Sequence, residues 1–142
     1  MKLLAVAVPV LCHVGFGADV LEVRIGSGPL RAHASAAPLP EYPARLAAAG
    51  RQGRVTAQIV VEPDGALGDV EIVEFTDASM GAAVRTALRG WKFRPIKTLA
   101  DRETVRATGR LTFSFRIQDG QAIVIDEAAV ANAAQAAKAA AK

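Results

Sequence analysis

Cysteine and aromatic residues are scarce in this chain. Its 142 residues include one cysteine, one tryptophan, one tyrosine and five phenylalanines. The cysteine, Cys12, lies in the N-terminal segment 1–18, so a mature chain that has lost this segment contains no thiol. Disulfides, thiol catalysis and cysteine-ligated metals are then excluded together. Hydrophobic residues form 51% of the chain, but many of them are alanine, which predicts one domain with a small core.

A set of catalytic residues is also missing. Beyond the N-terminal segment the one histidine is His33. The acidic residues that lie near one another in the sequence are Asp64, Asp69, Glu71, Glu74 and Asp77. No base matches them, and alternation along a strand directs them to different faces, so we expect a solvated surface and no hard-cation site. The sequence predicts a protein that is not an enzyme and that binds no metal or cofactor.

Runs of one charge are absent as well. The net charge is +3 and the isoelectric point is near 9.4, but the basic residues are interleaved with Asp and Glu along the whole chain. A nucleic-acid-binding protein would present its Lys and Arg as a stripe or cluster. We therefore expect no nucleic-acid partner, and we expect function to come from protein-binding surfaces.

Residues 1–18 have the pattern of a secretory signal. Lys2 precedes an apolar stretch, residues 3–16, and small residues follow it. The stretch is shorter than the ~20 apolar residues that a membrane span requires. A cleaved signal is therefore predicted, and a short uncleaved anchor is the alternative. Lipidation of Cys12 is disfavoured because Leu11 is too large for the residue before the cleavage site.

Residues 19–39 are expected to form a flexible lead-in. The segment contains a short apolar run, "VLEVRI", and then "GSGPLRAHASAAPLP", which has the composition of a linker. Pro43 suits the first turn of a short helix, and Gly50 suits its end.

A hairpin and a second helix follow. Apolar residues alternate with other residues from Val55 to Val61, and the same period recurs after the turn "PDG". Asp77 or Ser79 can then cap a helix whose apolar residues recur at helical spacing up to Trp91. We expect this helix to lie on the hairpin, and we expect Trp91 and Phe93 to belong to the core.

The last part of the chain predicts a strand, a turn, another strand and a helix. Leu111, Phe113, Phe115 and Ile117 alternate with Thr112, Ser114 and Arg116, which predicts one face in the core and one in water. The turn "QDG" would fold Ala122–Ile125 back as an additional strand within 118–126. Residues 127–142 predict an Ala-rich helix without a large apolar face, which would project or fray. The expected fold is α+β, with a three- to four-stranded antiparallel sheet, two helices packed on it and this tail.

The order of these motifs resembles the C-terminal domain of TonB-type energy transducers. The resemblance covers residues 40–117 and rests on "YPARLAAAGRQGRV", "VEPDG" and "ALRGWKFRP" in this order. It implies a periplasmic domain whose last strand is an open sheet edge. In the family, an extended segment of an outer-membrane receptor, the TonB box, pairs with that edge by β-augmentation. The implied partner is a TonB-dependent outer-membrane receptor or another envelope protein.

The resemblance also implies which residues meet the partner. The docking strand corresponds to Leu111, Thr112, Phe113, Ser114, Phe115, Arg116 and Ile117. Glu41, Tyr42, Pro43 and Arg45 would lie near the receptor plug, where Arg45 can pair with an acid. Glu41 stands where well-known members carry Gln, so a contact there would differ in charge. In the alternative, Tyr42 and Pro43 only direct the chain into the helix and Arg45 is solvated.

A complete transducer needs a membrane anchor for a proton-driven motor of the ExbB–ExbD type, and a long Pro-rich spacer. Residues 19–40 span only about 70 Å when fully extended, and the family's Pro-rich repeats are absent. We expect a stand-alone periplasmic binding module. The alternatives are a minimal transducer that keeps its N-terminus in the inner membrane and engages a motor, a structural or assembly adaptor, and a homodimer formed by strand swapping through residues 121–125.

The predicted additional strand raises a question about the docking edge. The strand is tethered to that edge at an effective concentration of roughly millimolar. A receptor segment of equal intrinsic affinity at micromolar concentration would lose to it by about 10³. The hypothesis is that Gln121–Ile125 covers the edge and autoinhibits the domain, or that binding occurs elsewhere.

Overall fold

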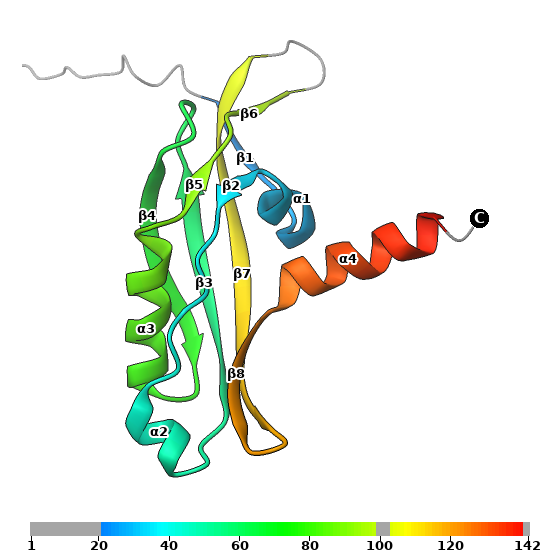
Figure 1. Ribbon diagram of the computed structural model, residues 1–142. Coiled ribbons are helices and arrows are strands. Elements are labelled where there is room, and N and C mark those ends of the chain that lie inside the picture. The colour runs from blue at the N-terminus through cyan, green and yellow to red at the C-terminus, as the bar shows by residue number, and fades with distance from the viewer. Residues whose placement is uncertain (1–20, 99–102, 141–142) are drawn as a thin grey trace, which may run out of the picture.

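One sheet organises the part of the chain that the computed structural model describes, residues 21–98 and 103–140 (Figure 1). In chain order the elements are β1 (Glu22–Arg24), α1 (Ser27–Ala32), β2 (Ala34–Ala36), α2 (Ala44–Ala48), β3 (Gly53–Val61), β4 (Leu67–Phe75), α3 (Ala78–Leu88), β5 (Lys92–Phe93), β6 (Ile96–Lys97), β7 (Thr104–Gln118), β8 (Gln121–Asp126) and α4 (Glu127–Ala140). The six-stranded sheet has the order β1-β7-β3-β4, and β6 and β8 also pair with β7. The predicted α+β fold with packed helices is confirmed, but the sheet has six strands instead of the predicted three to four, and β1 is parallel to β7, because segments outside the predicted sheet also pair with β7.

The β3–β4 hairpin has the predicted turn. Gly65 adopts a left-handed backbone with φ of 92°, which glycine accepts without strain. The Asp64 carboxylate accepts a hydrogen bond from the Ala66 amide at 2.9 Å, which stabilises the turn. A side chain at Gly65 would lie 2.3 Å from the Phe93 carbonyl oxygen, so the turn packs directly on β5.

Helix α3 covers the hairpin, as predicted. Of the two proposed capping residues the structure uses Asp77, whose carboxylate accepts a hydrogen bond from the Ser79 amide at 2.7 Å. Met80, Val84 and Leu88 are fully buried at helical spacing against the sheet. The helix therefore closes one face of β3 and β4 (Figure 1).

Strand β7 is longer than the predicted 111–117 and is an interior strand. It spans 15 residues, because the polar stretch before Leu111 also alternates, with Val105 and Ala107 buried. Strand β3 pairs with one side of it antiparallel from residue 107 to residue 115. On the other side lie β1, which is parallel, and β8, which is antiparallel.

The expectation of a flexible lead-in at 19–39 is wrong for residues 21–39. This segment carries β1, α1 and β2, and Leu30 of α1 is fully buried in the main core. Its partners are far away in the sequence: β1 pairs with β7, and β2 pairs with β5. Composition alone could not reveal pairing of this kind, because local Gly, Ser and Pro content carries no record of a distant strand.

The predicted signal segment, residues 1–18, lies outside the described residues, as does Cys12. Within residues 21–98 and 103–140, no helix combines the length and apolarity that crossing a membrane requires.

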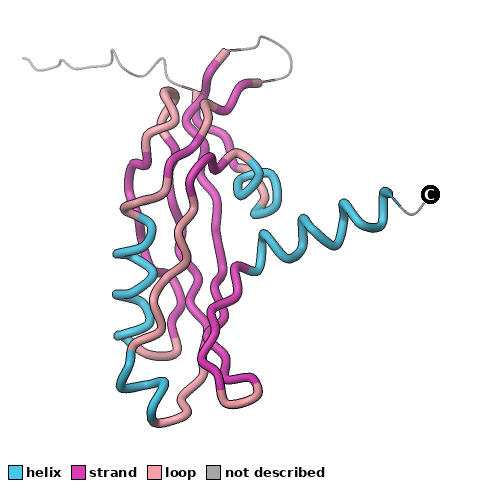
Figure 2. The backbone as a smooth tube through the Cα atoms, viewed as in Figure 1, coloured by secondary structure: helices cyan, strands magenta, loops and turns pink. Residues whose placement is uncertain are grey.

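Helix α4 leaves the body of the molecule at the end of β8. Figure 2 shows the strand passing directly into the helix, and the helix then points away from the sheet. Ala128 is buried at the base, whereas every residue from 133 to 140 is exposed. The predicted projection of this helix is therefore observed.

Trp91 anchors the core, as expected. Its side chain is 3% exposed, and its ring meets Phe113 edge-on at 5.9 Å between centroids. The indole Nε1 donates a hydrogen bond to the Pro38 carbonyl at 2.9 Å, which ties the segment before α2 to the end of α3.

We expect Trp91→Ala to lower the free energy of unfolding by ~3–5 kcal/mol, because it removes a buried ring and leaves a cavity. This is a large part of the ~5–15 kcal/mol that stabilises a typical domain. Urea denaturation followed by circular dichroism measures the loss. Trp91→Phe is the control, with an expected loss of ~1–2 kcal/mol. An unchanged urea midpoint in Trp91→Ala would contradict the assignment of Trp91 to the core.

Candidate functional site

The candidate site is the edge of β7 that faces away from β3. On this side the Arg106 amide donates to the Leu21 carbonyl at 2.9 Å, and the Thr108 carbonyl accepts from the Ile25 amide at 3.0 Å. Even-numbered residues of β7 thus direct their backbone groups to this edge. These are the groups that a β-augmenting partner would use. Strand β1 occupies them at residues 106–108.

Strand β8 occupies the other half of the same edge. It pairs with β7 from Phe113 to Gln118, across a two-residue turn formed by Asp119 and Gly120. Both turn residues have positive φ, 51° and 80°, as in the tight turns that suit hairpins. Counted from this turn, residues 121, 123 and 125 direct their backbone groups to β7, whereas Ala122 and residue 124 direct theirs outward.

Helix α1 fills the gap between β1 and β8. The Ser27 hydroxyl donates a hydrogen bond to the Arg110 carbonyl at 2.7 Å, at the point where neither strand reaches. The edge that the family resemblance presents as open is therefore covered by this chain itself. The hypothesis that Gln121–Ile125 covers part of this edge is confirmed, because a backbone edge of this length gains hydrogen bonds from any segment that can reach it.

The side chains of the predicted docking strand divide between the core and the other face. Leu111, Phe113 and Phe115 are fully buried in the core. Ser114 was expected to face water, but it is 2% exposed and its hydroxyl donates to the Glu127 carboxylate. The start of α4 covers this position, which the alternation of the strand could not show.

The remaining docking-strand residues keep polar surroundings. The hydroxyls of Thr112 and Thr56 lie 2.9 Å apart across β7 and β3, and the Arg116 side chain is exposed. Beyond the end of β3, the Ile117 amide donates to the Gln52 side-chain carbonyl at 2.8 Å. Gln52 thus continues the pairing of β3 by one residue, a role that no sequence signal indicated.

Tyr42 joins the second group of predicted contact residues to the docking strand. Its ring lies edge-on to Phe115, with 5.4 Å between centroids and 80° between planes. Its hydroxyl donates to the Arg51 carbonyl, so the residue bridges the two ends of the α2 segment. Pro43 is the residue before α2, with φ of −59°, which suits a helix start. Both residues therefore direct the chain into the helix.

A shallow groove of about 530 Å³ lies between this segment and α3. Glu41, Tyr42 and Pro43 form one wall, and small residues of α3 form the other. Leu39 lies at the groove with 54% of its surface exposed. Arg45 is exposed and forms no ion pair within the described part of the chain. The structure thus brings Glu41, Tyr42 and Pro43 together and leaves Arg45 outside the groove.

Among the described residues, two groups have shifted pKa values. Burial raises the pKa of the Tyr42 hydroxyl above its ordinary value of 10.0. The hydrogen bond from Arg106 Nε to the Glu62 carboxylate, at 2.8 Å, raises the pKa of the Arg106 guanidinium, and the Glu62 charge adds to the effect. Arg106 therefore stays charged and lies on the polar face of the sheet.

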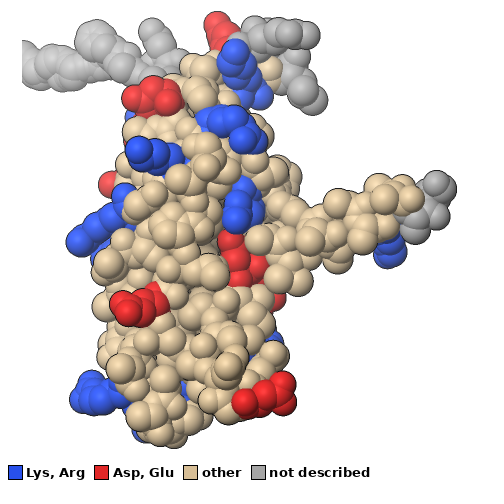
Figure 3. Space-filling view, in the orientation of Figure 1, with Lys and Arg blue, Asp and Glu red and all other residues tan. Residues whose placement is uncertain are grey.

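On the face drawn in Figure 3, the described residues form no patch of one charge sign. Figure 3 shows acidic and basic side chains interspersed over the face that it draws. Among the described residues, no group of three or more His, Cys, Asp or Glu is placed to hold a metal ion.

Comparison with known proteins identifies the family. The family model described as Gram-negative bacterial TonB protein C-terminal matches residues 38–117, which is more than half of the chain. This chain belongs to the TonB C-terminal family. The resemblance seen over residues 40–117 is thereby confirmed.

Two TonB proteins are similar to it. Protein TonB of Escherichia coli (strain K12) is 37% identical over 59 residues, which are 41% of this chain and 25% of that protein. The match thus spans a quarter of that relative's length. The solution NMR structure of the Pseudomonas aeruginosa TonB C-terminal domain superposes with a TM-score of 0.52 and 25% identity, covering 61% of this chain and 86% of that chain.

The segments that cover the β7 edge lie outside the match to the TonB C-terminal family. β1 and α1 precede residue 38, whereas β8 and α4 follow residue 117. The β7 edge therefore lies within the family-matched range, and the segments that cover it lie on either side of that range in the sequence. Ser27 was missed in the sequence, because a serine in a Gly- and Pro-rich stretch is typical of a loop.

Because the chain has one tyrosine, a titration of tyrosinate absorbance reports on Tyr42 alone. We expect a midpoint above 10.0 in the native protein and a return to about 10 in urea. A raised pKa means that folding favours the neutral hydroxyl, so this stabilising contribution is present below pH ~10 and is lost as pH rises through the native pKa.

Tyr42→Phe is the matched variant, because it keeps the ring against Phe115 and removes the hydrogen bond to Arg51. We expect it to lower the free energy of unfolding by ~1 kcal/mol at neutral pH. Equal native and unfolded midpoints in the titration of the unsubstituted protein would contradict the described burial of the hydroxyl.

Proposed function

We propose that this chain is a TonB-like protein-binding module of the periplasm, with a role in energy-dependent transport through TonB-dependent outer-membrane receptors. The observation that carries the proposal is the family match over residues 38–117, together with a fold that forms a long β7 edge. The function is binding, and the partner is an outer-membrane receptor or another envelope protein. The stand-alone form is proposed, and engagement of an ExbB–ExbD-type motor would require a retained N-terminal anchor.

The docking mode that we propose is β-augmentation of β7. Leu111–Ile117 would contribute mainly their backbone groups, because Leu111, Phe113 and Phe115 are fully buried. Glu41, Tyr42, Pro43 and Arg45 would contribute side-chain contacts, since Tyr42 packs on Phe115 and brings this segment close to the end of the strand. Selectivity would then come from the groove beside α3.

In this proposal β8 must leave the edge before a partner strand can bind. Strand β8 pairs with Phe113–Gln118, which is most of the predicted docking strand. As a tethered competitor it acts at roughly millimolar effective concentration, so a free peptide at micromolar concentration is disfavoured by about 10³. The resting domain is therefore autoinhibited. Exchange of residues 121–125 between two copies would use the same edge and produce a homodimer.

Two proline substitutions test this docking mode. Ile123 directs its amide to β7, so Ile123→Pro removes a hydrogen bond of the β7–β8 ladder. Ala122 directs its amide outward, so Ala122→Pro leaves that ladder intact and serves as the control. The probe is a set of fluorescein-labelled peptides that carry the TonB-box segments of receptors encoded in the same genome. Fluorescence anisotropy gives the Kd of each peptide.

We expect Ile123→Pro to tighten peptide binding by about 10- to 1,000-fold, because it removes part of the tethered competition. Ala122→Pro should leave the Kd unchanged. Equal Kd values for the two folded variants would show that peptides do not use the covered edge. Weaker binding by Ala122→Pro alone would move the docking site to the outer edge of β8.

A second candidate is a periplasmic structural or assembly adaptor that is not coupled to a proton motor. The observation in its favour is α4, whose residues 133–140 are all exposed and which projects from the domain (Figure 1). An isolated helix of this length is marginal in water, so a partner would stabilise it.

Deletion of residues 133–142 distinguishes the adaptor from the receptor-binding module. It removes the projecting part of α4 and retains β8 and the base of the helix. If the adaptor function holds, we expect the deletion to abolish the high-mass complex formed by the protein in envelope extract, as measured by size-exclusion chromatography. If the complex survives the deletion and is lost only in Tyr42→Ala, the adaptor function through α4 is contradicted.

A further inference from the structure

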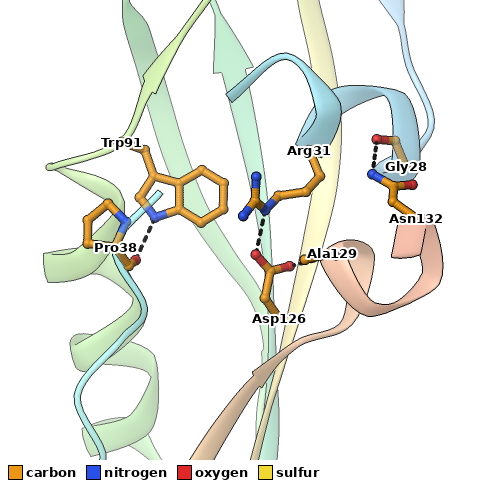
Figure 4. A network of polar contacts seen from close by, with 7 residues as sticks. All are labelled: Gly28, Arg31, Pro38, Trp91, Asp126, Ala129 and Asn132. Carbon is orange, nitrogen blue, oxygen red and sulfur yellow. Dashed lines mark hydrogen bonds and ion pairs between the residues drawn. The ribbon is translucent and has the colours of Figure 1, made fainter. Parts of the chain in front are cut away.

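Two segments far apart in the sequence meet over the edge of β7. Helix α1 follows β1, and α4 follows β8, and the two helices contact each other (Figure 4). Arg31 of α1 donates from Nε to the Asp126 carboxylate at 2.6 Å. Asn132 of α4 donates from its amide nitrogen to the Gly28 carbonyl at 2.9 Å. Together we call these two contacts the latch.

The Arg31–Asp126 contact connects three elements through one carboxylate. Asp126 is the last residue of β8 and is 6% exposed, so its charge is largely removed from water. One oxygen accepts from Arg31, and the other accepts from the Ala129 amide of α4 at 3.2 Å. A buried carboxylate of this kind depends on its partner, because loss of one member leaves an uncompensated charge.

Arg31 is held in place from the other side by the core. Its guanidinium carbon lies 5.3 Å from the centroid of the Trp91 ring, which is a cation–π contact. The latch is therefore connected to the core, because contacts continue from Asp126 through Arg31 to Trp91 (Figure 4).

Helix α1 packs tightly against both α4 and β7. A side chain at Gly28 would lie 2.8 Å from the Asn132 Oδ1 atom, so the two helices touch where only hydrogen fits. A side chain at Gly109 of β7 would lie 2.8 Å from Leu30 and from the Ile25 carbonyl oxygen. Leu30 itself is fully buried. The helix thus has one well-defined position, between β7 and α4.

The two strands that the latch joins are weak when taken alone. Strand β1 has three residues, two of them exposed, and among the described strands it pairs only with β7. Strand β8 has six residues and, within the same part of the chain, also pairs only with β7. Strands this short do not stay on a sheet edge through their own hydrogen bonds alone. Each strand therefore depends on the contacts made by the helix attached to it. Each attached helix contacts the other.

We propose that the latch couples β1 to β8, so that both strands leave the β7 edge together and the whole edge from residue 106 to residue 118 opens in one step. This coupling rests on the proposed function in one respect: the β7 edge is taken to be the docking site. A partner that displaces either terminal segment then exposes both halves of the edge. By linkage the effect is reciprocal: loosening β1 loosens β8 to the same extent, and the converse also holds.

Native-state hydrogen exchange of the ¹⁵N-labelled protein tests the coupling without any partner. The reporters are the amides of Ile123 and Ile125 in β8 and of Ile25 after β1, which bonds to Thr108. The Ile59 amide in β3 reports on the core. Arg31→Met keeps an unbranched side chain against Trp91 and removes the charge-assisted hydrogen bond.

We expect Arg31→Met to accelerate exchange of all three reporters by about 10- to 100-fold, the range that a charge-assisted hydrogen bond contributes, with Ile59 unchanged. Acceleration of Ile25 alone, or of Ile123 and Ile125 alone, would overturn the coupling. Equal acceleration of Ile59 would also overturn it, since the variant would then act on global stability.

Milder variants keep the test decisive if Arg31→Met does not fold. Asn132→Ala removes the second contact of the latch, and Gln135→Ala, on the exposed part of the same helix, is its control.

A second pair of variants acts on the glycines of this region. Gly28→Ala forces Asn132 to turn away, whereas the side chain added in Gly26→Ala meets only an ordinary contact at 3.6 Å. The first variant of each pair should accelerate both Ile25 and Ile123, and the second should accelerate neither. The opposite pattern would overturn the proposal.

The reciprocal measurement uses Ile123→Pro, which acts on β8 directly. Faster exchange of the Ile25 amide in this variant supports the latch, and unchanged exchange overturns it. This outcome is independent of peptide binding. If Ile123→Pro accelerates Ile25 but binds no TonB-box peptide, the latch holds and the docking proposal fails. If it binds peptide without affecting Ile25, the docking proposal holds and the latch fails.

Discussion

The backbone of β7 sets the constraint on which the rest of the structure depends. A 15-residue interior strand presents hydrogen-bonding groups on both sides, and each group left without a partner away from water is costly. Strand β3 satisfies one side along most of its length. The other side is satisfied by three separate pieces of the chain: β1, the Ser27 hydroxyl and β8. The architecture beyond the family-matched range is largely the solution to this requirement.

That solution has a functional consequence, because the pieces that cover the edge are individually weak. Strong pairing by a single long strand would close the edge permanently. In the proposed docking mode, short strands held by a few side-chain contacts, such as Arg31 with Asp126, would let the edge open without unfolding of the domain. A module that binds by β-augmentation needs this balance: a closed edge avoids aggregation with other strands, and an edge that can open remains available to its partner.

Local patterns predicted most of the central fold. The Pro-Asp-Gly turn, the cap at Asp77, the core position of Trp91 and the strand after the second turn all appear as the sequence indicated. The lead-in was misjudged because Leu30 lies in a stretch of small and polar residues, and its burial depends on a neighbour, Gly109, far along the chain. The groove is lined by Glu41, Tyr42 and Pro43, which are adjacent because they are consecutive in the sequence, whereas Arg45 does not line it.

The sequence by itself determined the family, the hairpin, the helix that covers it and the presence of a strand able to fold back on β7. These features follow from periodicity, turn chemistry and short motifs, which act over a few residues. Only the tertiary structure decided that the edge of β7 is closed and what closes it. Ser27 with Arg110 and Arg31 with Asp126 are separated by 83 and 95 residues. Contacts at such separations are set by the packing of the whole domain, and no local pattern records them.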